Sequence, residues 1–180
     1  MEKTLSSMAN PQRAAILCLG VSAALILGAH GFERLGGMAP CLLCLDQREA
    51  HWTALGVGAV LLALTQAGAA RVVAAGFGAL TLVYLFSAGL AAFHAGVEWG
   101  FWPGPDGCAA GGAAGLSTGD LLNSLNEPGP EGPPCSEAAW RLFGISMAGY
   151  NALISLGLAA VAGATCAVFA RRIDRGVVRT

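Results

Sequence analysis

Four stretches of the chain contain no Asp, Glu, Lys or Arg and are long enough to cross a lipid bilayer as helices, which takes roughly 17 to 25 residues. They run from Ala14 to Phe32, from Ala50 to Ala70, from Val72 to Val97 and from Leu142 to Ala170. Charged residues make up only 12% of the chain, against roughly 25% in a soluble domain. The sequence therefore predicts an all-α membrane protein, a bundle of four transmembrane helices at about 14–32, 50–70, 72–97 and 142–170, forming a single membrane domain over residues 1–180.

The charge balance argues against a nucleic-acid-binding protein. The formal net charge is −1, and the basic residues form no stripe that would follow a phosphate backbone. The first apolar stretch is longer than the core of a secretory signal and lacks a clean A-x-A cleavage site, so we expect it to be retained as a helix.

Basic residues predict the orientation, because positive charge is retained on the cytoplasmic side of a membrane. Nine of the eleven acidic residues fall on the opposite side, all except Glu2 and Asp174. Seven of the ten basic residues fall on the side of the two termini: Lys3, Arg13, Arg71, Arg171, Arg172, Arg175 and Arg179. Both termini are therefore predicted to be cytoplasmic.

Two loops then face outward, at about 33–47 and about 98–141. The second is rich in Gly and Pro, so we expect most of it to be irregular. Ser117 or Thr118 is placed to cap a short interfacial helix ending before Pro128; an irregular loop is the alternative. The predicted apolar face of that helix is Leu121, Leu122 and Leu125, and the residues expected to anchor helix ends at the outer interface are Trp52, Trp99, Trp102 and Trp140.

The predicted topology divides the six cysteines into two kinds. Cys18 and Cys166 lie in the middle of helices, where a thiol behaves as a small apolar group. The other four lie in the outward loops, two in each, on the side of the membrane where disulfides persist: Cys41, Cys44, Cys108 and Cys135.

Loop membership and spacing predict two disulfides, Cys41 with Cys44 and Cys108 with Cys135. A C-x-x-C bridge constrains very little chain, whereas a bridge between Cys108 and Cys135 closes a long loop and contributes around 3 kcal/mol. The first pair is therefore poorly suited to stapling and well suited to thiol exchange, in which one sulfur attacks while its neighbour waits to resolve the mixed disulfide. Two purely structural bridges remain an alternative.

The surroundings of Cys44 favour a thiolate. The second helix should begin within the C-x-x-C motif, which places Cys44 near the positive end of a helix dipole. Arg48 lies one turn further on and therefore on the same helical face; a snorkelling surface charge is the alternative for this residue.

Two metal-containing alternatives are weaker. A tetracysteine zinc site normally has its second pair at short spacing, which Cys108 and Cys135 lack. His30, His51 and His94 all lie towards outer helix ends, which is compatible with haem but does not require it. Leu45 stands where a c-type haem motif needs histidine.

These features together resemble a known family. The stretch "PCLLCLDQR" at the start of a second helix, four helices with both termini inside, and a long second loop with one more cysteine pair are similar to the DsbB disulfide-bond formation proteins of bacterial inner membranes. The resemblance covers nearly the whole chain. It implies a protein-disulfide oxidoreductase with periplasmic loops.

The resemblance also implies a route for electrons. A reduced, DsbA-like thioredoxin-fold protein attacks the second-loop disulfide at Cys108, and Cys135 is released to engage Cys41. Cys44 is thereby freed as a thiolate beside a bound quinone, either ubiquinone or menaquinone, which accepts the electrons.

We expect three side chains to line the quinone site: Arg48, His94 and Gln47. Arg48 is one helical turn from Cys44, Gln47 is its neighbour in the chain, and His94 lies at the outer end of the third helix. A thiol and quinone oxidoreductase similar to vitamin K epoxide reductase is the alternative enzyme, but its C-x-x-C motif would be expected late in the bundle.

Overall fold

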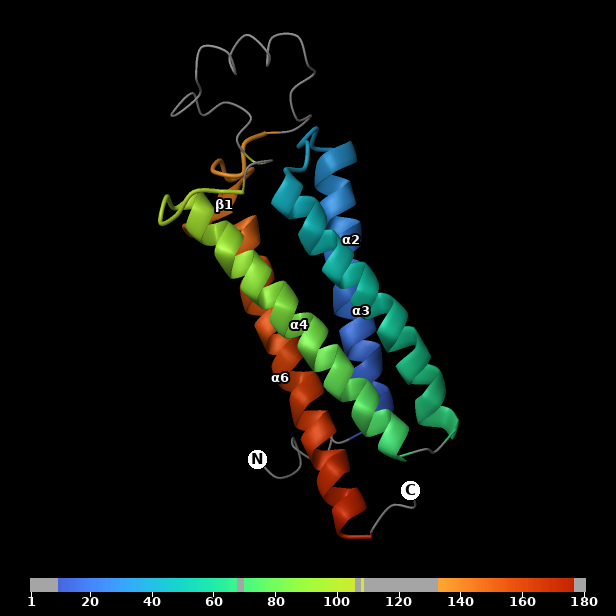
Figure 1. Cartoon of the computed structure of the whole chain (residues 1–180). Helices are drawn as coiled ribbons and strands as arrows, with labels where there is room; N and C mark the ends of the chain where they lie inside the picture. The colour runs from blue at the N-terminus through green and yellow to red at the C-terminus, as the bar shows by residue number, and fades with distance from the viewer. Residues whose placement is uncertain (1–9, 68–69, 106–107, 109–132, 177–180) are drawn as a thin grey trace, which may run out of the picture.

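The structure, a computed structural model, describes residues 10–67, 70–105, 108 and 133–176. Four long helices form one bundle (Figure 1): α2 (Pro11–Arg34), α3 (Leu42–Ala67), α4 (Ala70–Glu98) and α6 (Met147–Asp174). A small antiparallel hairpin of β1 (Arg141–Leu142) and β2 (Ile145–Ser146) precedes α6. The prediction of an all-helical bundle is confirmed for these four helices.

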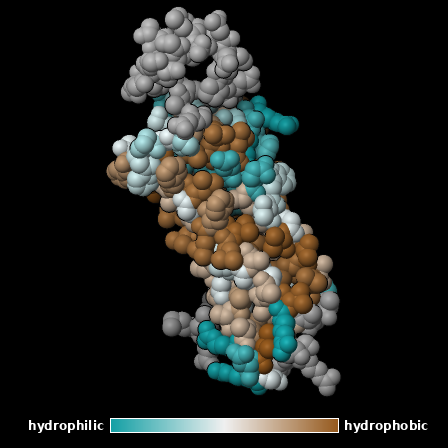
Figure 2. Space-filling view, viewed as in Figure 1, coloured by the Kyte–Doolittle hydropathy of each residue, from teal (hydrophilic) through white to brown (hydrophobic). Residues whose placement is uncertain are grey.

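Three of the helices, α2, α4 and α6, are long and apolar enough to cross a membrane. Hydrophobic residues cover the middle of the bundle on the face seen in Figure 2, and hydrophilic residues gather towards its two ends. Large apolar side chains such as Leu27, Leu82 and Phe86 point outward and are more than half exposed, as expected of a surface that faces lipid. The protein is a multi-pass membrane protein, and the crossing by α3 remains a prediction.

The centre of the bundle is formed mainly by α4, which packs against both α3 and α6. Phe77, Leu80 and Tyr84 of α4 are fully buried there. Cys18 of α2 is also fully buried in this core, and Cys166 packs against it. Both thiols are free and lie in the apolar core, which is consistent with the predicted packing role.

The second helix begins earlier than the predicted span of 50–70. It starts at Leu42, inside the C-x-x-C motif, so the first loop is shorter than the predicted 33–47. The absence of charge located only the lipid-embedded part of this helix, because Asp46, Arg48 and Glu49 occupy its first turns. Cys44 and the charged residues that follow it therefore belong to α3.

The fourth helix begins later than the predicted Leu142. Gly144 adopts a left-handed conformation with φ of 80°, and with Phe143 it forms the two-residue turn of the hairpin. Ser146 then caps α6 by accepting a hydrogen bond from the backbone of Gly149 at 3.2 Å. The helix cannot extend back through this turn, which an apolar stretch alone does not reveal.

The predicted interfacial helix near Ser117 to Pro128 lies outside the described residues. Of the predicted anchors, Trp52 and Trp99 are about half exposed. Trp140 instead contacts the rings of Phe32 and Tyr150. Phe32 lies near the end of α2 and Tyr150 in the first turn of α6.

Candidate functional site

The C-x-x-C motif lies at the N-terminus of α3. Cys41 and Cys44 are free thiols in this structure, not the predicted disulfide. Their sulfurs are 2.6 Å apart, and the backbone N–H of Cys44 donates to the Cys41 sulfur at 3.3 Å. The hydrogen bond between the two thiols raises the pKa of Cys41 and lowers the pKa of Cys44; Arg48 adds a smaller lowering at Cys44. Cys44 is thus the thiol of the pair that ionises first, as the sequence predicted.

The second pair, Cys108 and Cys135, is joined by a disulfide, which confirms the predicted pairing. Both residues are buried, and with Cys41, Leu43 and Val97 they form a compact apolar cluster. The segment after α4 and the segment before β1 are therefore fastened together directly over the start of α3.

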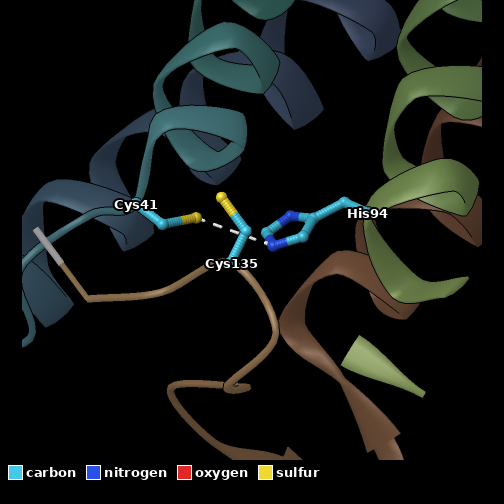
Figure 3. A group of neighbouring side chains, drawn as sticks. All are labelled: Cys41, His94 and Cys135. Atoms are coloured by element: carbon cyan, nitrogen blue, oxygen red, sulfur yellow. Dashed lines mark hydrogen bonds between the residues drawn. The ribbon is translucent and has the colours of Figure 1, made fainter. Parts of the chain in front are cut away.

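The two cysteine pairs meet at His94. The Cys41 sulfur, the Cys135 sulfur and a ring nitrogen of His94 all lie within 4.8 Å of one another, and all three residues are buried. Figure 3 shows the three side chains converging: Cys41 from the residue just before α3, His94 from α4, and Cys135 from the segment before β1. Because the Cys135 sulfur is bonded to Cys108, it is not a thiolate here, and the arrangement is better suited to exchange between disulfides than to a zinc site.

The amide of Gln47 holds the His94 ring from the other side. Its nitrogen donates to His94 Nδ1 at 2.8 Å and to the backbone oxygen of Leu43 at 3.1 Å. Asn151 of α6 donates to the Gln47 oxygen at 2.7 Å. The structure therefore brings Gln47 and His94 into the same site as the C-x-x-C motif.

Arg48 points across to α2. Its guanidinium forms an ion pair with Glu33 and donates to the backbone oxygen of Ala29 at 3.5 Å. Its side chain is 15% exposed. Arg48 is thus near Cys44, as predicted, but its closest charged partner is a carboxylate from another helix.

Glu98, the last residue of α4, adds a carboxyl group. Its side chain is 3% exposed, and Oε1 lies 3.8 Å from His94 Nε2. Its other oxygen, Oε2, has no hydrogen-bond partner among the described residues. A buried carboxyl with a free oxygen is costly, which marks this end of α4 as a functional location.

These groups surround one cavity of about 370 Å³ between α2, α3 and α6. Its walls are mostly apolar and include Ile26, Phe32, Trp140 and Ile154. Its polar lining includes Cys41, Cys44, Gln47, Arg48, His51, His94, Glu98, Glu137 and Asn151. An apolar cavity of this size with a few convergent polar groups is typical of a small-molecule site.

Comparison with known proteins agrees with this geometry. The sequence model of the family described as "Disulfide bond formation protein DsbB" matches residues 11–165. The chain belongs to the DsbB family. Neither a curated protein nor a solved structure gives a significant match.

Membership of the DsbB family confirms the resemblance seen in the sequence and identifies a disulfide oxidoreductase that works in disulfide-bond formation. It also favours this assignment over an enzyme similar to vitamin K epoxide reductase. The position of the C-x-x-C motif at the start of α3, early in the bundle, is consistent with that choice.

Sequence reasoning missed three residues of the site: Glu33, Glu98 and Asn151. All three stand in or at the ends of apolar helices, where a polar side chain is uncommon and commonly functional. That signal was available in the sequence. Their partners were not, because each partner lies on a different helix or a full turn away.

Proposed function

We propose that this DsbB-family protein reoxidises a periplasmic DsbA-like thiol oxidant and passes the electrons to a membrane quinone. The observation that carries the proposal is the closeness of Cys41 and Cys135, whose sulfurs lie within 4.8 Å. Two structural bridges have no need to touch, whereas disulfide exchange requires one sulfur to reach the other.

The first step is attack by a partner thiolate on the Cys108–Cys135 disulfide. Cys108 is the more exposed of the two, at 7% against 0% for Cys135, so the partner sulfur bonds to Cys108 and Cys135 leaves as a thiolate. The departing thiolate is then already beside Cys41. A second partner thiol resolves the mixed disulfide, which oxidises the partner and returns Cys108 as a thiol.

In the second step Cys135 attacks Cys41 and forms a new bond between the loops. The bond from Cys41 to Cys44 breaks and Cys44 leaves as a thiolate. A thiol of lower pKa is the better leaving group, and Cys44 is the residue whose pKa is lowered. Re-pairing of Cys108 with Cys135 then leaves Cys41 and Cys44 as the reduced pair.

A quinone in the cavity would supply an acceptor for the two electrons and two protons of this pair, allowing their disulfide to re-form. We assign Arg48 and His94 to this site, since both line the cavity: Arg48 supplies N–H donors, and the His94 ring would lie beside the quinone, next to Cys41. Gln47 lines the cavity too, but its amide already bonds to Leu43, His94 and Asn151. We therefore infer that Gln47 orients His94 and contacts the quinone less directly.

A quinone suits this task for energetic reasons. The disulfide of a DsbA-like partner is strongly oxidising, so a glutathione-like disulfide is too weak an electron acceptor to regenerate it and a stronger one is needed. A lipid-soluble acceptor reaches the cavity from within the membrane. The walls contributed by α2 and α6, both helices that are able to span the bilayer, support that route.

We also infer that the protein lies in the bacterial inner membrane with both termini cytoplasmic. The start of α2 and the end of α6 lie at one end of the bundle, and the start of α3, which holds the C-x-x-C motif, lies at the other (Figure 1). Arg13, Arg171, Arg172 and Arg175 gather at the first of these ends, which is the pattern expected of a cytoplasmic side.

Reconstitution tests the proposed function. The purified protein in liposomes containing ubiquinone or menaquinone should oxidise a reduced DsbA-like protein while the quinone absorbance changes. A partner that keeps only its attacking cysteine should be trapped on Cys108. A trapped adduct without quinone reduction would mean that quinone is not the electron acceptor. No adduct at any cysteine would mean that the loop cysteines form two structural bridges without a redox role.

A further inference from the structure

A chain of hydrogen bonds runs from the cysteine site into the middle of the bundle and includes all four described helices. It begins at His94 and ends at Tyr84, which donates to the backbone oxygen of Cys18. Its side chains are buried or partly buried. In order, they are His94, Gln47, Asn151, His51, Ser22 and Tyr84.

One backbone oxygen sets the direction of this chain. The carbonyl of Leu43 only accepts hydrogen bonds, so the Gln47 atom that faces it at 3.1 Å must be the amide nitrogen. The same nitrogen faces His94 Nδ1 at 2.8 Å. Nδ1 must therefore accept, and in the neutral ring the proton is on Nε2.

The Nε2–H group of His94 faces the sulfur of Cys41 and the carboxyl group of Glu98. It lies 3.6 Å from the Cys41 sulfur and 3.8 Å from Oε1 of Glu98. Both of these atoms accept hydrogen bonds when they carry negative charge. The opposite tautomer would present a lone pair to them.

The far side of Gln47 is fixed in the same way. Its oxygen accepts from the Asn151 nitrogen at 2.7 Å, so the Asn151 oxygen faces His51 Nε2 at 2.8 Å and must accept from it. His51 therefore carries its proton on Nε2, and its Nδ1 accepts from Ser22 at 3.3 Å. Because Ser22 has a single hydroxyl proton, the Tyr84 hydroxyl must donate to Ser22 as well as to the Cys18 oxygen. Ser155 adds a second donor to the Asn151 oxygen at 3.2 Å.

We propose that Asn151 and His51 are positioning residues that hold His94 as its Nε2–H tautomer, with that N–H aimed at the sulfur of Cys41. This inference rests on the proposed function, in which Cys41 leaves as a thiolate when Cys108 returns to Cys135. The N–H group then stabilises the new negative charge by hydrogen bonding, with no proton transferred. The alternative for such a chain is adhesion between helices in the membrane.

Histidine ring spectroscopy separates these two roles. The protein contains three histidines, so the signals of its ¹⁵N-labelled rings can be assigned in detergent by replacing one histidine at a time. In the wild type, His94 should have a protonated Nε2 and an unprotonated Nδ1. A wild-type His94 that is protonated on Nδ1 overturns the proposal directly, and this measurement needs neither partner nor quinone.

Two variants of one residue test the positioning. In alkaline buffer Asn151→Asp presents a charged acceptor to Gln47. A hydrogen bond to a carboxylate is roughly twice as strong as a neutral one, so it should outweigh the bond from Gln47 to Leu43, turn the amide and move the His94 proton to Nδ1. Asn151→Leu removes the donor without adding charge and leaves only Leu43 to orient the amide, so a minor Nδ1-protonated population should appear. Thr165→Val is the matched control, because Thr165 is buried but bonds only within its own helix, to Val161.

The exchange kinetics give the second measurement. Asn151→Asp should slow release of the reduced Cys41 and Cys44 pair by about tenfold, the effect of losing one ordinary hydrogen bond, and Asn151→Leu by less, while the KM for the partner is unchanged. Thr165→Val should have the wild-type rate and tautomer. If every variant that folds keeps the His94 proton on Nε2 and has the wild-type rate, the chain of hydrogen bonds only holds the helices together. Failure of quinone reduction with the tautomers as expected would instead count against the proposed function alone.

Discussion

Replacing Gly96 with alanine tests how the end of α4 positions the second disulfide. The ring of Trp102 folds back over Gly96, donates from Nε1 to the backbone oxygen of Phe93 at 2.9 Å, and stacks on the Phe93 ring at 5.8 Å between centroids. A Cβ at position 96 would lie 2.0 Å from Cζ2 of Trp102. Since carbon atoms pack at about 3.5–4.0 Å, the ring must move by about 1.5 Å or more.

The free-energy cost of that movement follows from the two interactions that hold the Trp102 ring in place. The hydrogen bond contributes about 1 kcal/mol and the ring pair about 0.5–1.5 kcal/mol, whereas alanine gains about 1 kcal/mol of helix propensity over glycine. The net destabilisation is therefore about 1 kcal/mol if the ring of Trp102 leaves. It approaches about 3 kcal/mol if the ring stays and the helix is strained instead.

The displacement should also reach the cysteines. Gly104 follows Trp102 closely and is packed between Val97 and Cys108, with 3.1 Å separating its Cβ position from Cβ of Cys108. A shifted Trp102 therefore moves the backbone beneath the Cys108 disulfide, and exchange with Cys41 should slow.

Gly89→Ala is the matched control, because it makes the same change in the same helix where nothing lies within 4 Å of the added methyl. Unfolding in detergent should show Gly96→Ala less stable than wild type and Gly89→Ala equal to it or more stable. The rate of mixed-disulfide formation should fall only in Gly96→Ala. Equal stability of the two variants would mean that Trp102 does not hold this end of α4.

Three further predictions concern the cysteines and Arg48. In the fully reduced protein, limiting iodoacetamide should label Cys44 before Cys41, since the pKa of Cys44 is lowered and that of Cys41 raised. As the pH falls, Cys44 should therefore keep its thiolate longer than Cys41. Peptide mapping that finds Cys41 labelled first contradicts this prediction. Replacing Cys18 or Cys166 with alanine should leave turnover unchanged, because both thiols are free and lie in the apolar core; lost turnover in a variant that still folds would give them a redox role. Arg48→Ala should raise the quinone concentration needed for half-maximal turnover by roughly tenfold to 150-fold, the effect of losing one charge-assisted hydrogen bond. Arg48→Lys should recover part of this loss. An unchanged quinone dependence would mean that Arg48 serves only as a structural partner of α2.

The local features of this protein were readable from its sequence. Charge-free stretches identified the helices because a charged side chain in lipid is costly wherever it occurs along the chain. The spacing of Cys41 and Cys44, and the start of a helix within their motif, are also local facts. So is the division of the cysteines between core and loops, which separated Cys18 and Cys166 from the reactive set.

The ends of the helices were less predictable. The charge-free stretch began only at Ala50, because charged residues occupy the first turns of α3; the C-x-x-C motif, not the apolar span, indicated the start at Leu42. The hairpin before α6 depends on the backbone at Gly144, and an apolar composition carries no information about that conformation.

Contacts between helices were decided only by the tertiary structure. Whether Arg48 meets Glu33, or Asn151 meets Gln47, depends on the rotation of each helix about its axis and on its height in the bundle. Only the family resemblance, and no local pattern, implied that Cys135 reaches Cys41, since the two are separated by α3 and α4 in the chain. The sequence determined which reactive groups the protein has and on which side of the membrane they are predicted to lie; packing of the four helices determined which of them touch, because contacts between distant segments depend on the arrangement of the whole bundle.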